Sequence, residues 1–396
     1  MWERNIYSKI FSKAFDIPVA INYWDGTKEY YGGTKPKINI KIKSPIPLRK
    51  IVNKPTLVLG EAYMNGQIEI KGSIEELIAS AFRQKHGFLA RKPLPKFVKK
   101  FQHSTGSSKN DIQEHYDIGN DFYKMWLDKT LTYSCAYFRK KDDTLEQAQK
   151  NKIMHVLYKL KMRPNKKLLD IGCGWGTLLF IAAQKFGVQA TGITLSQEQY
   201  NYIRKIINDK GLEGKVNVKL ADYRKLHERY DYITSIGMFE HVGKENLGTY
   251  FKKVKKLLKV NGRALIHGIT GQHNGLGVDP FLIKYIFPGG YIPNLAENLR
   301  YIMNAGLQIS DLESLRRHYQ RTLEIWYKNY SQVVNKVAKK YSKRFARMWS
   351  LYLQACAGSF KAGNIDVFQY LLVNGTSGTG LPMTRDYIYE EENKNN

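Results

Sequence analysis

The strongest indicator of the fold is the segment Lys167-Leu168-Leu169-Asp170-Ile171-Gly172-Cys173-Gly174-Trp175-Gly176. Its first five residues form the short, mostly apolar run that is typical of a buried strand. The glycines at 172, 174 and 176 permit a tight turn in which the backbone approaches a ligand closely before a helix opens. The segment therefore predicts a strand, a ligand-binding turn and a helix over Thr177–Phe186.

The residues on either side continue the alternation of strand and helix. Strands separated by helices of this length indicate a parallel, doubly wound α/β sheet. Helices are also predicted over Gln147–Met162 and Gln197–Asn208. The further predicted strands are Val188–Ile193, Val216–Leu220, Tyr232–Ile236 and Arg263–Gly268.

The glycine spacing also indicates the kind of ligand. A dinucleotide turn of the form G-x-G-x-x-G would place its third glycine at position 177, which is Thr. The spacing instead favours S-adenosylmethionine, whose carboxylate the helix N-terminus attracts. The second strand ends without a carboxylate, so Thr194 and Gln199 are the candidates for the ribose hydroxyls. Asp222 and Tyr223 follow the third strand and suit the adenine amino group and ring.

A length of 396 residues predicts two domains. Residues 1–90 predict a smaller N-terminal α+β domain, with alternating strands at Lys37–Lys43 and Gly66–Gly72 and a helix over Ser73–Phe82. Residues 91–110 are basic and contain prolines and a glycine, which predicts a linker. Residues 111–396 predict the catalytic domain.

The chain is strongly basic, with 63 Lys and Arg against 35 Asp and Glu and a net charge of +28. This imbalance predicts a polyanionic partner, either nucleic acid or an anionic membrane surface. Candidate basic patches are Arg91–Lys100, Lys252–Lys259 and Lys336–Arg347, the last of them within a helix predicted over Gln332–Trp349. Three cysteines argue against a disulfide framework. With no apolar run long enough to cross a bilayer and no signal-peptide core, we expect a cytoplasmic protein that can lie on a membrane.

Several segments together resemble one known family. They are His115–Tyr123, Leu131–Phe138, Asp170–Gly176, Gly192–Gln199 and Met238–Gly243. The Tyr-Ser-Cys-Ala-Tyr run at 133–137 and the Phe-Glu-His-Val-Gly run at 239–243 are the most specific of these motifs. Over roughly residues 100–390 the chain resembles the cyclopropane-fatty-acyl-phospholipid synthases, relatives of the mycolic-acid cyclopropane synthases. Residues 1–90 are similar in position and size to the lipid-binding N-terminal domain of the members that act on phospholipids.

The resemblance implies a class I methyltransferase (Rossmann-like) domain that transfers a methylene from S-adenosylmethionine to a cis double bond of a membrane phospholipid. It also implies that an enzyme-bound bicarbonate deprotonates a carbocation, and no metal is expected. The positions that carry over to the bicarbonate are Cys135 and Ile269 through their backbones, and Glu240, His267 and Tyr319. The residues expected at the cofactor are Tyr133, Ser134, Asp170, Gly172, Gly174, Thr194, Gln199, Asp222 and Tyr223.

Glu240 raises a question that the residues leave open, since two adjacent anions repel each other. Either the bicarbonate O–H donates to Glu240 or Glu240 is itself protonated. The expected partners are unsaturated phospholipid at the inner face of an anionic membrane and a second copy of the chain in a homodimer.

Three other functions remain as alternatives. A related C-methyltransferase that acts on acyl chains would give methyl-branched or hydroxylated products from the same cation. An RNA methyltransferase would explain the positive charge, although no nucleic-acid partner is expected. A lipid-binding protein without activity is disfavoured by the intact glycine turn and by Glu240.

Overall fold

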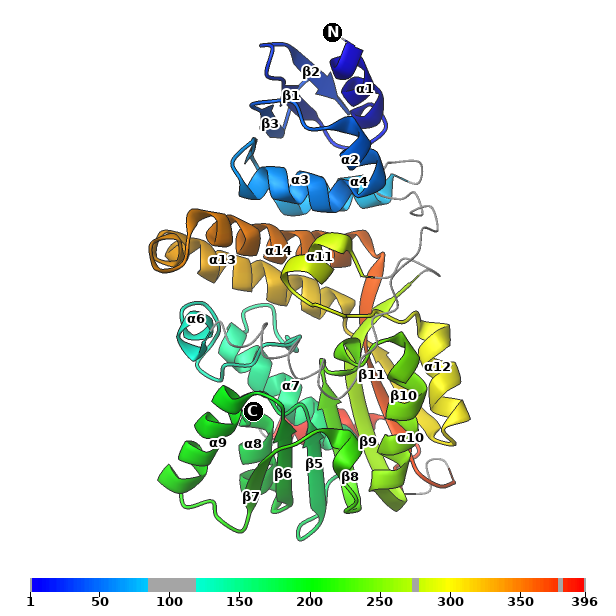
Figure 1. Ribbon diagram of the computed structural model, residues 1–396. Coiled ribbons are helices and arrows are strands. Elements are labelled where there is room, and N and C mark those ends of the chain that lie inside the picture. The colour runs from blue at the N-terminus through cyan, green and yellow to red at the C-terminus, as the bar shows by residue number, and fades with distance from the viewer. Residues whose placement is uncertain (1, 85–118, 273–277, 377–379, 395–396) are drawn as a thin grey trace. The chain divides into compact units, whose positions relative to one another are not determined.

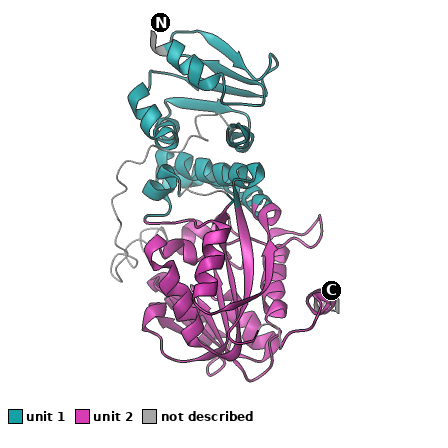
Figure 2. Cartoon of the chain, turned by 90° about the vertical axis from the view of Figure 1, so that its right-hand side faces the viewer, with its two compact units in different colours: residues 1–100, 272–288, 320–365 teal, residues 101–271, 289–319, 366–396 magenta. Residues whose placement is uncertain are grey.

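The computed structural model describes residues 2–84, 119–272, 278–376 and 380–394, with side chains from 4 to 390 within those ranges. These residues divide into two compact units, each assembled from separate stretches of the chain (Figure 2). Unit 1 comprises residues 1–100, 272–288 and 320–365, and unit 2 comprises residues 101–271, 289–319 and 366–396. The predicted linker over 91–110 and the basic patch Arg91–Lys100 lie outside the described residues, and the predicted domain boundaries stay a prediction.

Unit 1 contains a four-stranded sheet in the order β2-β1-β3-β4. The pairs β1–β2 and β3–β4 are antiparallel, and β1–β3 is parallel. The predicted alternation is present in β3, where Ile38, Ile40 and Ile42 are buried and Lys41 is exposed. The elements of the N-terminal part are α1 (Trp2–Phe11), β1 (Val19–Asn22), β2 (Lys28–Tyr31), β3 (Ile38–Ile42), α2 (Leu48–Asn53), α3 (Pro55–Met64), β4 (Ile68–Lys71) and α4 (Ile74–Arg83).

Later segments of the chain supply three helices to unit 1, namely α11 (Pro280–Tyr285), most of α13 (Arg316–Lys340) and α14 (Lys343–Ala362). The prediction of one helix over Gln332–Trp349 is wrong, because α13 ends at Lys340 and α14 begins at Lys343. Ser342 adopts an extended conformation and its hydroxyl accepts a hydrogen bond from the backbone N–H of Phe345, at 3.0 Å. This cap starts a new helix in the middle of the predicted one.

Unit 2 contains a seven-stranded sheet in the order β10-β11-β9-β8-β5-β6-β7 (Figure 1). The pairs β5–β6, β6–β7, β5–β8 and β8–β9 are parallel, as predicted, whereas β10–β11 is an antiparallel pair that was not predicted. The strands are β5 (Lys167–Ile171), β6 (Gln189–Thr194), β7 (Val216–Leu220), β8 (Tyr230–Ile236), β9 (Leu258–Gly271), β10 (Gln308–Ser314) and β11 (Ile365–Val373).

Helices cover both faces of this sheet and enclose two apolar cores. One core joins the strands to α7 (Leu145–Lys159), α8 (Thr177–Phe186) and α9 (Gln197–Asp209). The other joins them to α10 (Leu247–Leu257) and α12 (Leu295–Asn304). The remaining elements are α6 (Asn120–Lys124), the 3-10 turns η1 (Tyr223–Lys225), η2 (Phe239–His241) and η3 (Lys244–Asn246), and α15 (Asp386–Lys394).

The strand order fixes the place of a ligand site. From β5 the chain proceeds outward to β6 and β7 and then returns to β8 on the other side of β5. Ligands of open α/β sheets bind at such a reversal, beyond the carboxyl ends of the strands. The glycine turn follows β5 directly and therefore lies at this point.

No helix within the described ranges is both long and apolar enough to cross a membrane.

Candidate functional site

The turn after β5 requires glycine at two positions, Gly172 and Gly176, for the same two reasons. Gly172 has φ +78°, and a Cβ there would lie 3.0 Å from Cγ of Met238. Gly176 has φ +85° and is the N-cap of α8, where a Cβ would lie 2.9 Å from Cγ1 of Ile203. Both positions combine a left-handed backbone with close packing, so a larger residue would be strained or would displace the turn.

A pocket opens beside this turn, and its wall contains all nine residues predicted at the cofactor. These nine residues come from the ends of β5, β6 and β7 and from the segment before α7. His241, after β8, also lines the pocket. The nine are Tyr133, Ser134, Asp170, Gly172, Gly174, Thr194, Gln199, Asp222 and Tyr223.

Asp170 is the last polar residue of β5 and faces this pocket from a buried position. The Thr234 hydroxyl donates a hydrogen bond to its Oδ1 at 2.7 Å. Burial raises the pKa of Asp170 to about 6, against the opposing effects of Thr234 and of Lys152. The group therefore carries a negative charge at neutral pH and can attract a ligand cation.

Thr194 and Gln199 form one hydrogen-bonded pair where β6 passes into α9. The Thr194 hydroxyl donates to Oε1 of Gln199 at 2.7 Å and accepts from the backbone N–H of Ser196 at 3.1 Å. Ser196 in turn caps α9 by accepting from the N–H of Gln199. This pairing orients the Gln199 amide so that its nitrogen can donate to a ligand diol.

Asp222 has a partner that the sequence reasoning missed. Its two carboxylate oxygens accept from the Arg224 guanidinium at 2.6–3.1 Å. Burial alone would raise the pKa of Asp222, but the hydrogen bonds from Arg224 outweigh it and lower the pKa below its ordinary value. Asp222 is thus an anion. The Asp-Tyr-Arg run over 222–224 was the feature of the sequence that could have indicated its pairing with Arg224.

The segment that carries Tyr133 and Ser134 is held by two buried side chains of α7, which the sequence reasoning also missed. The amide nitrogen of Gln149 donates to the carbonyls of Thr132 at 3.2 Å and Ser134 at 2.8 Å. Nζ of Lys152 donates to the Ser134 hydroxyl oxygen at 2.9 Å. Two polar residues among apolar neighbours on one face of a helix were the available signal.

Glu240, in η2 after β8, has a buried carboxylate that is only partly satisfied. Its Oε1 accepts a hydrogen bond from the backbone N–H of Ile269 at 2.7 Å. Its Oε2 is inaccessible to solvent and has no partner in the structure as described. Burial raises the pKa of Glu240 to about 7, because the hydrogen bond from Ile269 offsets only part of the cost of burying the charge.

His267 lies two residues before Ile269 on β9, so the two side chains point to the same face of the strand. Its Nδ1 lies 3.3 Å from the amide nitrogen of Gln369. Because that nitrogen can only donate, Nδ1 accepts and the ring proton sits on Nε2. Nε2 is buried and has no partner among the described residues. Burial lowers the pKa of His267 to about 3, so the ring is neutral at pH 7.

Cys135 lies beside the start of α13, one helical turn before Tyr319. The buried Sγ of Cys135 lies 3.9 Å from the Leu315 carbonyl oxygen, and the Tyr319 N–H donates to that oxygen at 3.0 Å. Tyr137 also stacks on His318, with ring centroids 4.7 Å apart.

The five residues predicted at the bicarbonate thus fall into smaller groups. A hydrogen bond joins Glu240 to Ile269, and His267 pairs with Gln369. Cys135 contacts the Leu315 carbonyl, four residues before Tyr319 in the chain. None of the five lines the cofactor pocket as its described residues define it. The Ile269 N–H, predicted to donate to the anion, donates to Glu240.

A bicarbonate fits the polar atoms that are left over. The orphaned Glu240 Oε2 is an acceptor and the orphaned His267 Nε2–H is a donor. Bicarbonate offers both an O–H and acceptor oxygens, so it can satisfy two buried atoms of opposite kind. The residues present are therefore compatible with this anion.

Comparison with known proteins places the chain in a family. Residues 103–370 match the family described as mycolic acid cyclopropane synthetase, and residues 6–93 match a domain of unknown function (DUF7884). A cyclopropane-fatty-acyl-phospholipid synthase of Escherichia coli K12 is 35% identical over 88% of this chain and 90% of its own length. A probable fatty acid methyltransferase of Pseudomonas putida is 36% identical over 95% of this chain and 98% of its own length.

Solved structures agree with this placement. The cyclopropane synthase MmaA2 from Mycobacterium tuberculosis superposes with a TM-score of 0.64 at 35% identity, covering 67% of this chain and 98% of that one. The mycolic acid cyclopropane synthase CmaA1, complexed with SAH and CTAB, has a TM-score of 0.64 at 34% identity, with the same coverage of both chains. The predicted doubly wound methyltransferase fold is therefore confirmed, and the chain belongs to the mycolic acid cyclopropane synthetase family of S-adenosylmethionine-dependent methyltransferases.

Proposed function

We propose that this enzyme converts the cis double bond of unsaturated acyl chains in membrane phospholipids into a cyclopropane ring. The observation that carries the proposal is the similarity to the cyclopropane-fatty-acyl-phospholipid synthase of E. coli, which is 35% identical over 88% of this chain. The mycolic acid synthases, by contrast, match 66% of it. The chain therefore shares more of its length with the relative named for phospholipids.

When bound, S-adenosylmethionine supplies an electrophilic methyl group on a sulfonium. The predicted residues around the glycine turn hold its adenosyl and amino-acid parts, which leaves the chain's own task as alignment. An alkene is a poor nucleophile, and correct orientation of reacting groups is worth roughly 7–11 kcal/mol. Attack by the double bond leaves a positive charge on the acyl chain, which the face of a tyrosine can stabilise.

Loss of a proton from the newly added carbon closes the ring. A bound bicarbonate would supply the base, and its proposed partners are Cys135, Glu240, His267 and Tyr319, while Ile269 holds Glu240 through its backbone N–H. The neutral His267 suits this role because its Nε2–H donates without adding a charge. Glu240, with a pKa of about 7, can accept a hydrogen bond as an anion or donate one as an acid. A dry site also prevents water from trapping the cation as an alcohol.

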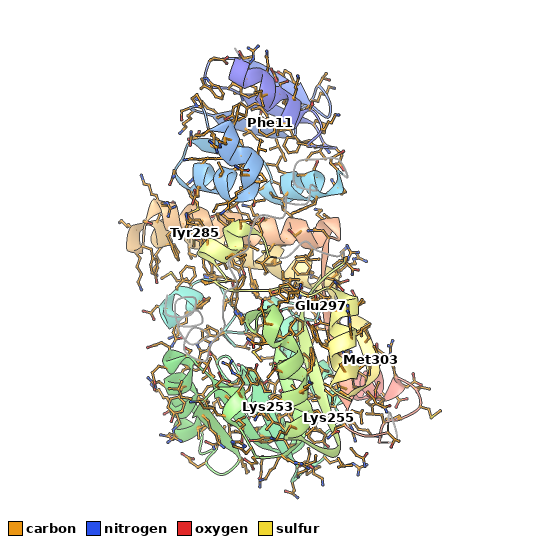
Figure 3. All side chains as sticks on the ribbon, turned by 45° about the vertical axis from the view of Figure 1, so that its right-hand side comes forward. Phe11, Lys253, Lys255, Tyr285, Glu297 and Met303 are labelled. Carbon is orange, nitrogen blue, oxygen red and sulfur yellow. The ribbon has the colours of Figure 1, made fainter. Side chains whose placement is uncertain are left out.

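A positively charged surface of unit 2 suits attachment to an anionic membrane. We define the basic hollow as Arg229, Lys252, Lys255 and Lys256 with Leu258, Ala305 and Asn374. Two apolar side chains on neighbouring elements are unusually exposed, Val260 at 73% and Met303 at 61%. Figure 3 labels Lys255 on α10 and Met303 on α12. Each cation near such a surface contributes about 1 kcal/mol to binding. Peripheral attachment at the inner face of the cell membrane, and a homodimer, complete the proposal.

The decisive experiment incubates the enzyme with methyl-labelled S-adenosylmethionine and vesicles of cis-unsaturated phospholipid. We expect the acyl chain to gain one CH₂ and to show the upfield proton resonances of a cyclopropane. Vesicles of saturated phospholipid are the control and should acquire no label. Label in RNA with none in lipid would contradict the proposal.

A second function has a specific observation in its favour, the 36% identity to a protein named as a fatty acid methyltransferase. A methyl-branched alkene has the same mass as the cyclopropane, but catalytic hydrogenation saturates it readily. A hydroxylated product carries an additional water. NMR and hydrogenation of the same lipid extract therefore separate the three outcomes.

A further inference from the structure

Three aromatic rings from three separate elements of unit 2 form one stack. The aromatic stack consists of Tyr137 in the segment before α7, His155 on α7 and His318 at the start of α13. The ring centroids of Tyr137 and His155 are 4.2 Å apart with planes 11° from parallel, and those of Tyr137 and His318 are 4.7 Å apart at 16°. Tyr137 follows Cys135 by two residues and His318 directly precedes Tyr319. The stack therefore connects the chain segments that carry two of the proposed partners of the base.

Backbone hydrogen bonds hold the same segment at two points. The Phe138 N–H donates to Nδ1 of His318 at 3.0 Å, and the Tyr137 N–H donates to the Ala148 carbonyl of α7 at 3.0 Å. Because a backbone N–H can only donate, Nδ1 of His318 accepts and carries no proton. The segment around Tyr137 is thus attached to α7 on one side and to α13 on the other.

His155 is held in turn by a carboxylate from a neighbouring strand. Burial alone would raise the pKa of Glu313 on β10, but the hydrogen bond from His155 and the charge of Lys159 lower it to about 2. Glu313 is therefore an anion at neutral pH and can only accept. Nε2 of His155 donates to its Oε2 at 2.7 Å, and Nζ of Lys159 donates to the same oxygen. We call Glu313 and Lys159 the ionic anchor.

The ionic anchor is not explained by packing alone. A charge pair withdrawn from water is often no more stable than well-packed apolar residues of similar volume. What the anchor adds is orientation, because the bond to Glu313 fixes the plane of the His155 ring and hence the plane on which Tyr137 stacks. Orientation has a large effect on rate, since a misplacement of about 1 Å can cost an enzyme roughly 100-fold.

We propose that the aromatic stack positions the Cys135 segment against the start of α13 for the reaction, with the ionic anchor as its support. Tyr137, His155 and His318 are then positioning residues that act through Cys135 and Tyr319. For its catalytic consequence the inference rests on the proposed function, in which Cys135 and Tyr319 are partners of the base. Its structural consequence is a Cys135 segment that opens when the stack is lost, and this is measured without lipid or bicarbonate.

The test follows the buried thiol of Cys135, with the buried thiol of Cys173 as a reference in the same chain. Cys173 lies in the glycine turn after β5 and takes no part in the stack. Full-length wild type, Tyr137→Leu and Tyr137→Phe are incubated with N-ethylmaleimide, and mass spectrometry gives the labelling rate at each thiol. We expect Tyr137→Leu to accelerate labelling of Cys135 by roughly 10-fold or more, because two stacked pairs are lost. Labelling of Cys173 should change by less than about twofold, the usual coupling between separate sites.

The conservative variant and the kinetics separate positioning from general loss of structure. Tyr137→Phe keeps the ring, so it should restore the slow labelling of Cys135. Tyr137→Leu should lower turnover of unsaturated phospholipid by roughly 10-fold or more, because the Cys135 segment is displaced. Its Kd for S-adenosylhomocysteine should stay within about twofold of the wild-type value. Turnover should recover in Tyr137→Phe together with the labelling rate.

Tyr341→Leu is the matched control. Tyr341 is likewise half-buried and stacks on Phe345 with ring centroids 5.0 Å apart, but it belongs to unit 1. This variant should leave both labelling rates unchanged.

Three outcomes would overturn the proposal. They are equal acceleration at Cys135 and Cys173 in Tyr137→Leu, unchanged labelling of Cys135, and fast labelling of Cys135 with unchanged turnover. If the wild type forms no cyclopropane, the proposed function fails, and the labelling rates still decide whether the stack holds the segment. Should Tyr137→Leu fail to fold, His318→Leu removes a different ring of the stack, and the ratio of the two labelling rates decides in the same way.

Discussion

Glu240 and His267 have both lost most of their contact with water, and burial shifts their pKa values in opposite directions. The pKa of the carboxyl rises to about 7 and that of the imidazole falls to about 3. Both shifts favour the uncharged form, because a low-dielectric surrounding penalises charge. At neutral pH the histidine is neutral, and the carboxyl lies close to its midpoint, where either protonation state of Glu240 is accessible.

The raised pKa of Glu240 predicts how this carboxyl affects the free energy of unfolding. Between its ordinary pKa of 4.5 and its folded value of about 7, the unfolded chain loses the proton before the folded chain does. The free energy of unfolding therefore falls as pH rises through this window. Glu240→Gln removes the penalty, so its stability relative to wild type should increase between pH 5 and pH 8 by on the order of 1–3 kcal/mol. Urea denaturation in bicarbonate-free buffer measures this difference.

The same variant should lose turnover while it binds S-adenosylhomocysteine normally, because Glu240 does not line the cofactor pocket as described. Glu245→Gln is the control, since Glu245 is exposed and lies five residues away. A pH-independent stability difference would mean that the Glu240 carboxyl is not buried in solution. Full activity of Glu240→Gln would remove it from the proposed base site.

At the scale of single elements, the junction between α13 and α14 shows how one N-cap divides a predicted helix into two. Val337, Tyr341, Phe345 and Met348 keep helical spacing across the junction, which is why the pattern predicts a single helix. Two of the four, Val337 and Met348, are buried and belong to packed helices of unit 1. At least part of this row of apolar side chains therefore packs in the core of unit 1.

Removal of the cap should destabilise the junction. Ser342→Ala leaves the Phe345 N–H without its partner, and we expect the free energy of unfolding to fall by roughly 0.5–2 kcal/mol. Ser331→Ala is the matched control, because Ser331 lies within α13 and its hydroxyl donates to the carbonyl of Lys328. Urea denaturation followed by circular dichroism compares the two variants. An equal effect of both substitutions would contradict the capping role.

At the scale of the whole molecule, the net charge of +28 predicts that vesicle binding is electrostatic. Binding to anionic phospholipid vesicles should weaken steeply between low and physiological salt, since screening shortens the reach of exposed charges. Sedimentation of vesicles with bound protein measures this. Binding that does not respond to salt would indicate hydrophobic attachment instead.

The contribution of the basic hollow to vesicle binding can be compared with that of exposed lysines elsewhere on unit 2. Replacing Lys252 and Lys256 by Gln should reduce vesicle affinity by roughly tenfold or more, at about 1 kcal/mol per cation. The control replaces Lys205 and Lys210 by Gln and so removes the same charge. Both lysines are exposed; Lys205 lies on α9 and Lys210 follows its last residue. Equal losses in the two double variants would show that net charge acts without a specific surface.

Local patterns were sufficient for the cofactor half of the site. The glycine turn, the strand ends and the residues that follow them are encoded by short-range spacing, and strand β5, helix α8 and strand β7 have the predicted bounds. The nine predicted cofactor residues line one pocket because the ends of parallel strands meet at one edge of a sheet.

The alternation of strand and helix, the methyltransferase turn and the residue types around it could all be predicted from local sequence patterns. The partners of buried polar groups depend on tertiary packing, as in Glu240 with Ile269, His267 with Gln369 and Lys152 with Ser134. These pairs are separated by 29, 102 and 18 positions along the sequence. Hydropathy patterns report which face of an element is buried, but they carry no information about which distant atom satisfies a hydrogen bond there.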